Sequence, residues 1–295
     1  MNQIRLGTRK SALALAQANK VANILIDEFN LEVVIVPIVT SGDKIQDKAL
    51  YEIGGKSLFV KELEEALLDG SIDIAVHSLK DIPAHMPIGL KIGSVLERED
   101  PRDTIVSLSG YNINSLPLGS IVGTSSTRRK IQLLRLRPDL QIVSCRGNID
   151  SRINKLYAEK FDAIILAQVG IDRLGLNVPC SAISTDIMPP APGQGVIALQ
   201  VHTQNNNAQF FCDQLNHELT FKVIQAERGF VEALNASCRT PIAAFASLDK
   251  TTNMINAHYM LASFDGGKYF TKSSSCPLLD GYKMAFDIAK FISKS

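Results

Sequence analysis

The stretch IDIAVHSLKDIP, residues 72–83, joins a strand pattern to a polar loop and decides the fold class. Residues 72–76 form a short, mostly apolar run of the kind that buried strands have, and Pro83 cannot continue such a strand. The loop after the strand contains His77, Ser78, Lys80 and Asp81. Ligands of open α/β sheets bind outside the carboxyl ends of the strands, so this loop predicts a site.

The residues before this stretch alternate between strand and helix patterns. We predict a strand over 4–6, a turn over 7–10, and a helix that follows the N-cap Ser11 and ends near residue 26. A second buried strand is predicted over 33–39 and a second helix between residues 59 and 70. This order is typical of the βαβ units from which α/β lobes are built.

The middle of the chain repeats this order of elements. Strands predicted over 121–122, 141–144 and 163–167 run into polar loops at 123–129, 146–148 and 168–170. Residues 188–195, MPPAPGQG, contain three prolines, so they predict a crossing segment rather than a helix or a central strand. A further apolar strand is predicted over 196–201. Two α/β lobes with one cleft between them follow from this pattern.

The pattern changes near residue 215. A long helix is predicted up to Leu234, then two antiparallel strands over 242–246 and 255–264. A final amphipathic helix would use Met284, Ile288 and Ile292 on its apolar face. These elements predict a separate, small α+β domain.

Composition excludes several classes of protein. A chain of 295 residues that is 45% hydrophobic is expected to form two or three domains. A net charge of +1 and 6% aromatic residues argue against a nucleic-acid binder. No run approaches the roughly twenty apolar residues that cross a bilayer, and the start of the chain has no signal-peptide pattern, so we expect a cytoplasmic protein. The five cysteines form no CxxC pair, so reduced thiols and no metal site are expected.

Basic residues gather in the predicted strand-to-helix loops. Guanidinium groups pair bidentately with carboxylates, and hydroxyls and backbone amides at helix starts add anion donors, so these loops suit a ligand with several carboxylates. Ordinary solvated surface arginines are the alternative interpretation. The arginines concerned are Arg9, Arg128, Arg129, Arg146, Arg152 and Arg173, and the hydroxyl-rich loop is Thr124, Ser125, Ser126 and Thr127.

Two further residues have one functional and one structural interpretation each. Asp81 is either a carboxylate that stabilises positive charge and assists proton transfer, or a turn residue paired with Lys80. Cys238 is either a thiolate favoured by the adjacent Arg239, or a small buried hydrophobic residue. His77 is expected to be a hydrogen-bonded structural residue. The residues alone suggest reactivity without naming a reaction.

Eight segments, in order and spread over the whole chain, resemble the porphobilinogen deaminase family. They are GTRKS (7–11), GGKSLFVKELE (54–64), AVHSLKDIP (75–83), EDPRD (99–103), VGTSSTRR (122–129), RGN (146–148), PGQG (192–195) and SCRTPI (237–242). The resemblance implies that four porphobilinogen molecules are joined head to tail into hydroxymethylbilane for tetrapyrrole biosynthesis, with loss of ammonia at each step. It also implies a dipyrromethane primer, covalently attached through a thioether to Cys238.

The resemblance assigns roles to residues of this chain. Asp81 would stabilise the cationic azafulvene that loss of ammonia creates, and Arg9 would position the leaving amine. The cofactor-binding positions are Cys238, Lys80, Asp81, Thr124, Ser125, Ser126, Arg128, Arg129, Arg146 and Gly147. The substrate-binding positions are Arg9, Ser11, Lys56, Ser78, Arg146, Asn148, Arg152, Arg173 and Gln194.

The resemblance also implies a three-domain monomer without nucleic-acid or membrane partners. Two doubly wound lobes would resemble type II periplasmic binding proteins, and a smaller α+β domain would carry the cysteine. The expected ranges are 1–96 with 197–214, then 97–196, then 215–295. This chain departs from the family pattern at Ala236 and Ser237, where glycines are usual, and at Glu52, where a lysine is common. A pair of solute-binding lobes without chemistry is the competing hypothesis.

Overall fold

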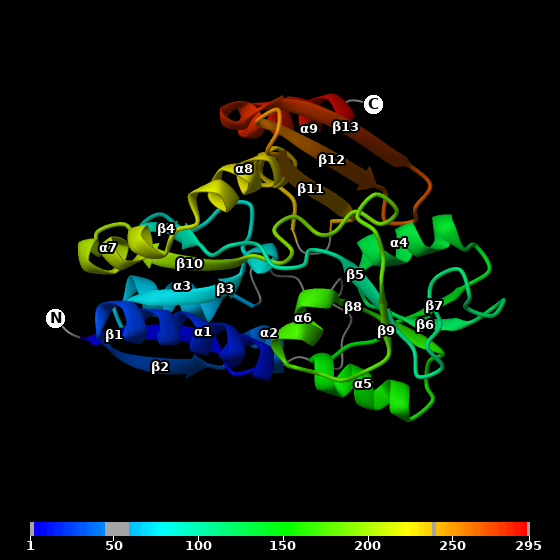
Figure 1. Cartoon of the computed structure of the whole chain (residues 1–295), viewed down its shortest axis with the longest axis horizontal. Coiled ribbons are helices and arrows are strands. Elements are labelled where there is room, and N and C mark those ends of the chain that lie inside the picture. The colour runs from blue at the N-terminus through cyan, green and yellow to red at the C-terminus, as the bar shows by residue number, and fades with distance from the viewer. Residues whose placement is uncertain (1–2, 45–58, 238–239, 294–295) are drawn as a thin grey trace.

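The chain folds around three β-sheets, two of them mixed and flanked by helices. The computed structural model describes residues 3–44, 59–237 and 240–293. The strand orders are β2-β1-β3-β10-β4 in the first sheet, β7-β6-β8-β5-β9 in the second, and β11-β12-β13 in the third. Figure 1 shows the first two sheets beside each other, with the third above them. Two α/β lobes with a small antiparallel domain confirm the predicted fold class.

The first lobe contains the first sheet and three longer helices. Its elements are β1 (Gln3–Arg9), α1 (Ala12–Phe29), β2 (Glu32–Ile38), α2 (Ser41–Lys44), α3 (Lys61–Leu68), β3 (Ile74–Ser78), the short 3-10 helix η1 (Leu79–Asp81), β4 (Leu90–Val95), β10 (Ile197–His202) and α7 (Asn206–Leu215). β1 is parallel to β2 and β3, whereas β10 is antiparallel to β3 and β4. The predicted turn over 7–10 is wrong for residues 7–9. Gly7, Thr8 and Arg9 continue β1 and pair with β2.

Helices cover both faces of the first sheet. Ser11 caps α1 as predicted, since its hydroxyl accepts a hydrogen bond from the Ala14 amide at 3.3 Å. α1 and α7 share one hydrophobic core with the sheet, to which Leu25 and Phe211 belong. α3 packs on the sheet through a second core that includes Leu63. These two cores hold the sheet fixed, so the loops at its strand ends have a rigid base.

The second lobe repeats this plan with shorter elements. They are β5 (Asp103–Val106), β6 (Ile121–Gly123), α4 (Thr127–Leu136), β7 (Gln141–Val143), α5 (Ile149–Tyr157), β8 (Ala163–Ala167), α6 (Gln168–Arg173) and β9 (Cys180–Ala182). β6 is parallel to β7 and β8, and β5 is antiparallel to β8 and β9. The polar loop predicted over 168–170 is wrong, because α6 begins directly after β8.

Two crossing segments connect the lobes and lie against each other. The Glu99 amide donates to the Gly195 carbonyl at 3.1 Å, and the Leu96 amide donates to the Ile197 carbonyl at 3.0 Å. Gly195 has a φ of +87°, and a Cβ there would lie 2.5 Å from the Glu99 carbonyl oxygen. Only glycine fits this crossing. Residues 188–196 form no helix or strand, as the prolines predict.

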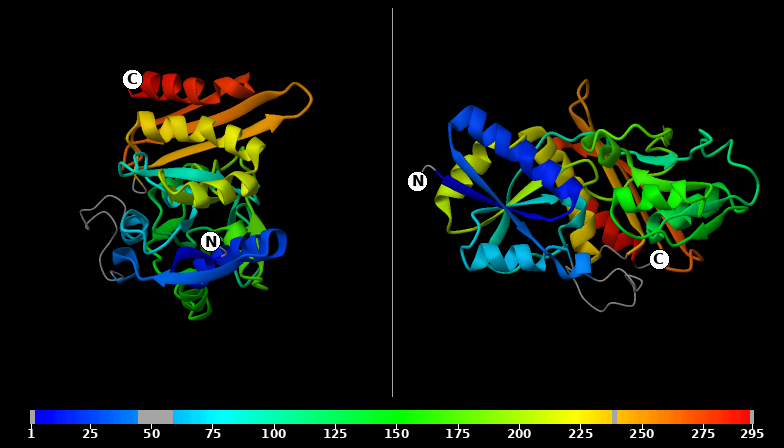
Figure 2. Two further views of the ribbon diagram at one scale, coloured as in Figure 1. Left: turned by 90° about the vertical axis from the view of Figure 1, so that its left-hand side faces the viewer. Right: turned by 90° about the horizontal axis from the view of Figure 1, so that it is seen from below.

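The third sheet packs on two helices of its own and on the second lobe. Its elements are α8 (Glu218–Ala233), β11 (Ile242–Asp249), β12 (Met254–Ala262), β13 (Tyr269–Pro277), η2 (Leu278–Asp280) and α9 (Gly281–Ile292). The predicted final helix is confirmed, but β13 was not predicted. Met260 on the sheet clusters with Ile131 of α4. The two views of Figure 2 show this domain seated along both lobes.

Candidate functional site

A cleft lies where the two lobes meet the third domain. It consists of two adjoining hollows with volumes of about 360 and 630 Å3, each within the range of ~300–1,000 Å3 that small-molecule sites have. Both hollows are lined by Phe59, Lys80, Asp81, Ser125, Arg129 and Arg152. The shared wall makes them parts of one site.

Most of the predicted site residues line this cleft. The first hollow brings together Lys80, Asp81, Ser125, Ser126, Arg128, Arg129, Arg152 and Gln194. The second adds Arg9, Ser11, Ser78, Arg146, Gly147, Asn148 and Arg173. Thr124 does not line either hollow; it is buried behind the loop, where its hydroxyl accepts from the Ser126 amide at 3.2 Å. Lys56, Glu52 and Cys238 lie outside the described residues.

The starts of two helices shape the anion-binding side of the cleft. Ser126 caps α4 and accepts from the Arg129 amide, and Asn148 caps α5 and accepts from the Ser151 amide at 2.9 Å. Gly147 has a φ of +109°, and a Cβ there would lie 2.6 Å from the Ser151 hydroxyl. The backbone conformation of this turn therefore requires glycine.

Arg128 and Arg129 are held from behind the cleft wall by Asp103. The Asp103 carboxylate lies 2.8 Å from Nη1 of Arg128 and 2.7 Å from Nη2 of Arg129. All three side chains are at least nine-tenths buried. Burial alone would raise the pKa of Asp103, but the two guanidinium charges outweigh it and hold that pKa far below its usual range. The two arginines are thus oriented by the protein and are not loose surface charges.

Other cleft arginines are oriented in the same way. Arg9 forms an ion pair with Asp43, and its guanidinium carbon lies 4.5 Å from the centre of the Phe59 ring. Arg173 donates to Glu99 at 2.6 Å, and Glu99 also pairs with Lys20 of α1. Burial raises the pKa of Glu99, but its hydrogen bond to Lys20 and the charge of Arg173 bring it below the usual value.

Lys80 and Arg152 differ, because neither forms an ion pair among the described residues. Lys80 donates to Gln194 at 3.5 Å, and Arg152 donates to the Gly147 carbonyl at 2.8 Å. Burial lowers the pKa of Lys80 to about 8, with the charge of Arg129 acting in the same direction. Burial likewise lowers the pKa of Arg152 to about 10. Two desolvated cations without a carboxylate partner indicate a site for an anionic ligand.

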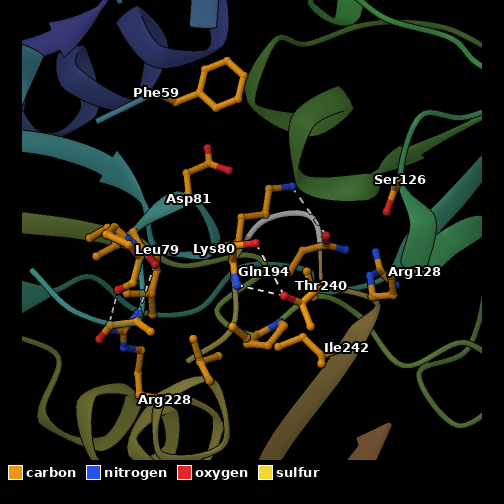
Figure 3. Close-up of a pocket in the computed structure, with 18 of the residues that line it drawn as sticks. Phe59, Leu79, Lys80, Asp81, Ser126, Arg128, Gln194, Arg228, Thr240 and Ile242 are labelled. Carbon is orange, nitrogen blue, oxygen red and sulfur yellow. Dashed lines mark hydrogen bonds between the residues drawn. The ribbon is translucent and has the colours of Figure 1, made fainter. Parts of the chain in front are cut away.

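Asp81 stands at the centre of the cleft. It ends η1, which is tied to the crossing segment because the Leu79 amide donates to the Val196 carbonyl at 2.9 Å. Figure 3 shows its carboxylate directed into the pocket, on the side of the Phe59 ring. The neighbouring His77 is structural, as predicted: it is buried, and its Nε2 lies 3.0 Å from Oε1 of Gln200.

The residues on either side of position 238 line the first hollow. They are Asn235, Ala236 and Ser237 before it and Thr240 after it. The Ser237 amide donates to the Thr240 hydroxyl at 3.0 Å. Asn235, which follows the end of α8, has a φ of +45°. The left-handed backbone conformation therefore occurs before Ala236 and Ser237. Three of the other cysteines are buried as expected, whereas Cys180 is exposed.

Positive charge is concentrated in this cleft although the chain is nearly neutral. Among the described residues that line it, the carboxylates are Asp43 and Asp81. The cations are Arg9, Lys10, Lys80, Arg128, Arg129, Arg146, Arg152, Arg173 and Arg228. The described part of the chain contains no cluster of three metal-ligating side chains. No helix in that part is long and apolar enough for a membrane span.

Three residues of the site escaped the sequence analysis. Phe59 borders both hollows, and Asp103 and Arg228 orient groups in the walls. Phe59 and Asp103 lie inside two of the family-like segments, which is the signal that could have drawn attention to them. Arg228 lies in none of the eight segments.

These observations define a class: a two-lobed α/β protein whose cleft is rich in cations and holds one central carboxylate, Asp81. Two family models match the chain, described as porphobilinogen deaminase, dipyromethane cofactor binding domain, over residues 4–209, and porphobilinogen deaminase, C-terminal domain, over residues 221–293. The chain belongs to the porphobilinogen deaminase family.

Relatives match over nearly the whole chain. The porphobilinogen deaminase of Orientia tsutsugamushi (strain Boryong) is 46% identical over 293 residues, which cover 99% of this chain and 98% of that protein. That of Rickettsia bellii (strain OSU 85-389) is 49% identical over 272 residues, with coverage of 91% and 90%.

Likeness among solved structures is weaker. The sulfate-bound regulatory domain of an OxyR2 mutant from Vibrio vulnificus is 15% identical, with a TM-score of 0.46 over 72% of this chain and 92% of that one. The fold class therefore rests on the strand orders of the three sheets.

Proposed function

We propose that this chain joins four porphobilinogen molecules into hydroxymethylbilane, with release of ammonia, on a dipyrromethane primer bound through a thioether to Cys238. Membership of the family supports the activity and the primer. The observation that carries the proposal is the pair of desolvated cations, Lys80 and Arg152, that face the Asp81 pocket without a carboxylate partner among the described residues. Each pyrrole ring brings an acetate and a propionate, which would supply those partners.

The cleft residues fit dipyrromethane by charge and by position. Carboxylates of the primer would meet Lys80, Arg128, Arg129 and Arg146, with the hydroxyls of Ser125 and Ser126 as further donors. When bound, the primer supplies the pyrrole carbon to which the first substrate is joined. The chain on both sides of position 238 borders the same hollow, which favours attachment there.

Asp81 would stabilise positive charge on the substrate. Loss of ammonia from the aminomethyl group leaves a cationic fragment, and a carboxylate in a water-poor cleft attracts that charge more strongly than it would in water. Asp81 is also placed to accept hydrogen bonds from the pyrrole N–H groups and to take up the proton that the pyrrole carbon loses when it is joined. Arg9 forms an ion pair with Asp43 and a guanidinium is a poor acid, so we assign it the positioning of substrate rather than acid catalysis.

The remaining anion-binding roles, the domain ranges and the monomeric state are part of the same proposal. Ser11, Lys56, Ser78, Asn148, Arg152, Arg173 and Gln194 would bind carboxylates of substrate or of the growing chain. We propose the ranges 1–96 with 197–214, 97–196 and 215–295 for the three domains. Limited proteolysis that cuts within these ranges in preference to the connections would argue against them.

Intact mass and turnover test the proposal together. The purified protein should be heavier than the bare polypeptide by one dipyrromethane, and Cys238→Ala should remove that added mass. Cys180→Ala, which changes an exposed thiol outside the cleft, should keep it. Asp81→Asn should fold and lose nearly all hydroxymethylbilane synthesis. A bare polypeptide that binds anions without turnover would support the solute-binding alternative instead.

A further inference from the structure

One helix, α8, reaches the cleft at two places. Arg228 lies in its third turn, and the helix ends at Ala233, just before the residues that lead into position 238. Arg228 and Asn235 both line the first hollow, on the same wall. α8 is held firmly against α9, because Gly229 leaves room for the Tyr282 carbonyl, which a Cβ would approach to 2.6 Å. Arg228 and the end of α8 are therefore parts of one rigid element, and Asn235 follows two residues after that end.

The Arg228 guanidinium donates hydrogen bonds to the backbone that follows Asp81. Nη1 donates to the Ile82 carbonyl at 3.1 Å, and Nη2 donates to the Pro83 and Ala84 carbonyls at 2.8 and 3.0 Å. The Arg228 side chain is 6% exposed. Figure 3 shows the guanidinium reaching from α8 to this backbone. The segment Ile82–Ala84 belongs to no sheet. One side chain of the third domain therefore binds three of its consecutive carbonyls.

The fork geometry of the guanidinium is needed for this arrangement. Arginine contacts the carbonyls through two terminal nitrogens held in a fixed plane, whereas lysine has one nitrogen on a flexible stem and cannot reproduce both sets of contacts. Glu232, one turn further along α8, accepts from Arg228 at 3.3 Å and from the Tyr282 hydroxyl at 2.8 Å. The guanidinium is therefore itself oriented.

We propose that Arg228 is a positioning residue that sets the place of the Asp81 carboxylate relative to the attachment end of α8. Because Asp81 precedes Ile82 directly, fixing the carbonyls of Ile82, Pro83 and Ala84 fixes the backbone that carries it. The role rests on the proposed function, since it matters only when a primer attached at Cys238 must meet Asp81. Misplacing a catalytic group by about 1 Å costs on the order of 10²-fold in rate.

Arg228→Lys in the full-length protein tests the role, with Arg137→Lys as a matched control. Arg137 also donates to three backbone carbonyls, those of Ile113, Leu116 and Pro117, but it lines neither hollow of the cleft. R228K should keep the primer mass, lose on the order of 10²-fold in kcat with little change in KM, and show faster amide hydrogen exchange over 82–86. R137K should show faster exchange near residues 113–117 and retain its kcat.

Several results would overturn the positioning role. Exchange over 82–86 that is unchanged in R228K contradicts it, as does a kcat within about twofold of that of R137K. Loss of the primer mass from a folded R228K protein would assign Arg228 to attachment instead. If R228K does not fold, Glu232→Gln should still lower kcat about fivefold and loosen the same amides, and the absence of both effects contradicts the role. A parent protein without primer and turnover contradicts the proposed function, whereas the exchange measurement still decides on Arg228.

Discussion

Replacing Asp103 by Asn should destabilise the protein more than any comparable change of a surface carboxylate. Asp103 is fully buried and accepts hydrogen bonds from Arg129 Nε at 3.1 Å and Nη2 at 2.7 Å and from Gln194 at 2.9 Å. It also forms an ion pair with Arg128, whose Nη1 lies 2.8 Å from the carboxylate. Asn has no charge and can turn an NH2 group toward a guanidinium. Two buried cations would then lack their counter-charge.

The expected size of the effect follows from this geometry. Removing one partner of a buried, hydrogen-bonded ion pair costs about 3–5 kcal/mol in the free energy of unfolding. A loss of that size lowers Tm by about 10 °C in a protein of this length. Asp100→Asn is the control, because Asp100 pairs with the half-exposed Arg102 and ion pairs near the surface contribute about 0–1 kcal/mol.

Urea unfolding followed by far-ultraviolet circular dichroism measures both variants, since the chain has no tryptophan for fluorescence. D103N should lower the midpoint strongly and D100N should barely change it. Free energies of unfolding for the two variants that agree within about 1 kcal/mol would refute the argument that Asp103 neutralises buried charge.

Three further predictions concern titration and primer attachment. The pKa of buried His77 is lowered to about 4 from an ordinary value near 6.5, so the folded state keeps it neutral and loses about 3 kcal/mol of stability from this group as the pH falls from 7 through 4. His77→Gln should flatten that part of the urea midpoint against pH, and an unchanged slope contradicts the assignment. The pKa of Lys80 is about 8, so primer-free protein should bind the primer's carboxylates more weakly as the pH passes 8, while Lys80→Arg should bind them equally well up to about pH 9; equal profiles would rule Lys80 out as the titrating group. Cys238→Ala should lack primer mass under conditions in which Cys180→Ala retains it, and primer on both variants would place the attachment elsewhere.

The α/β lobes were predictable because buried strands leave a clear signal. Runs such as 163–167 are apolar on both faces, and polar loops follow them directly. β13 (Tyr269–Pro277) left no such signal, because it is an edge strand on which most side chains are half-buried or exposed. Its Lys, Ser and Thr residues form a polar pattern that is typical of a loop.

The members of the candidate site were predictable, but their pairing was not. Strand-end loops meet at one edge of each sheet, which brought Arg9, Lys80 and Arg146 together as expected. The pairing of Arg129 with Asp103 depends on β5 lying antiparallel to β8 in the middle of the second sheet. Nothing in the spacing of these residues specifies that register. Contacts across 146 residues, such as that of Arg228 with Ile82, are equally invisible in the sequence.

The internal carboxylates orient the cleft cations without cancelling their charge. Asp103 serves two arginines, so the cluster keeps one net positive charge. Glu99 is shared between Arg173 and Lys20, so that cluster also keeps one, although the contact with the half-exposed Lys20 is weak. A ligand carboxylate therefore meets guanidinium groups whose orientation is already fixed, and little side-chain entropy is lost when it binds. The same design explains why mutating a hidden carboxylate such as Asp103 should disturb a cleft that it does not line.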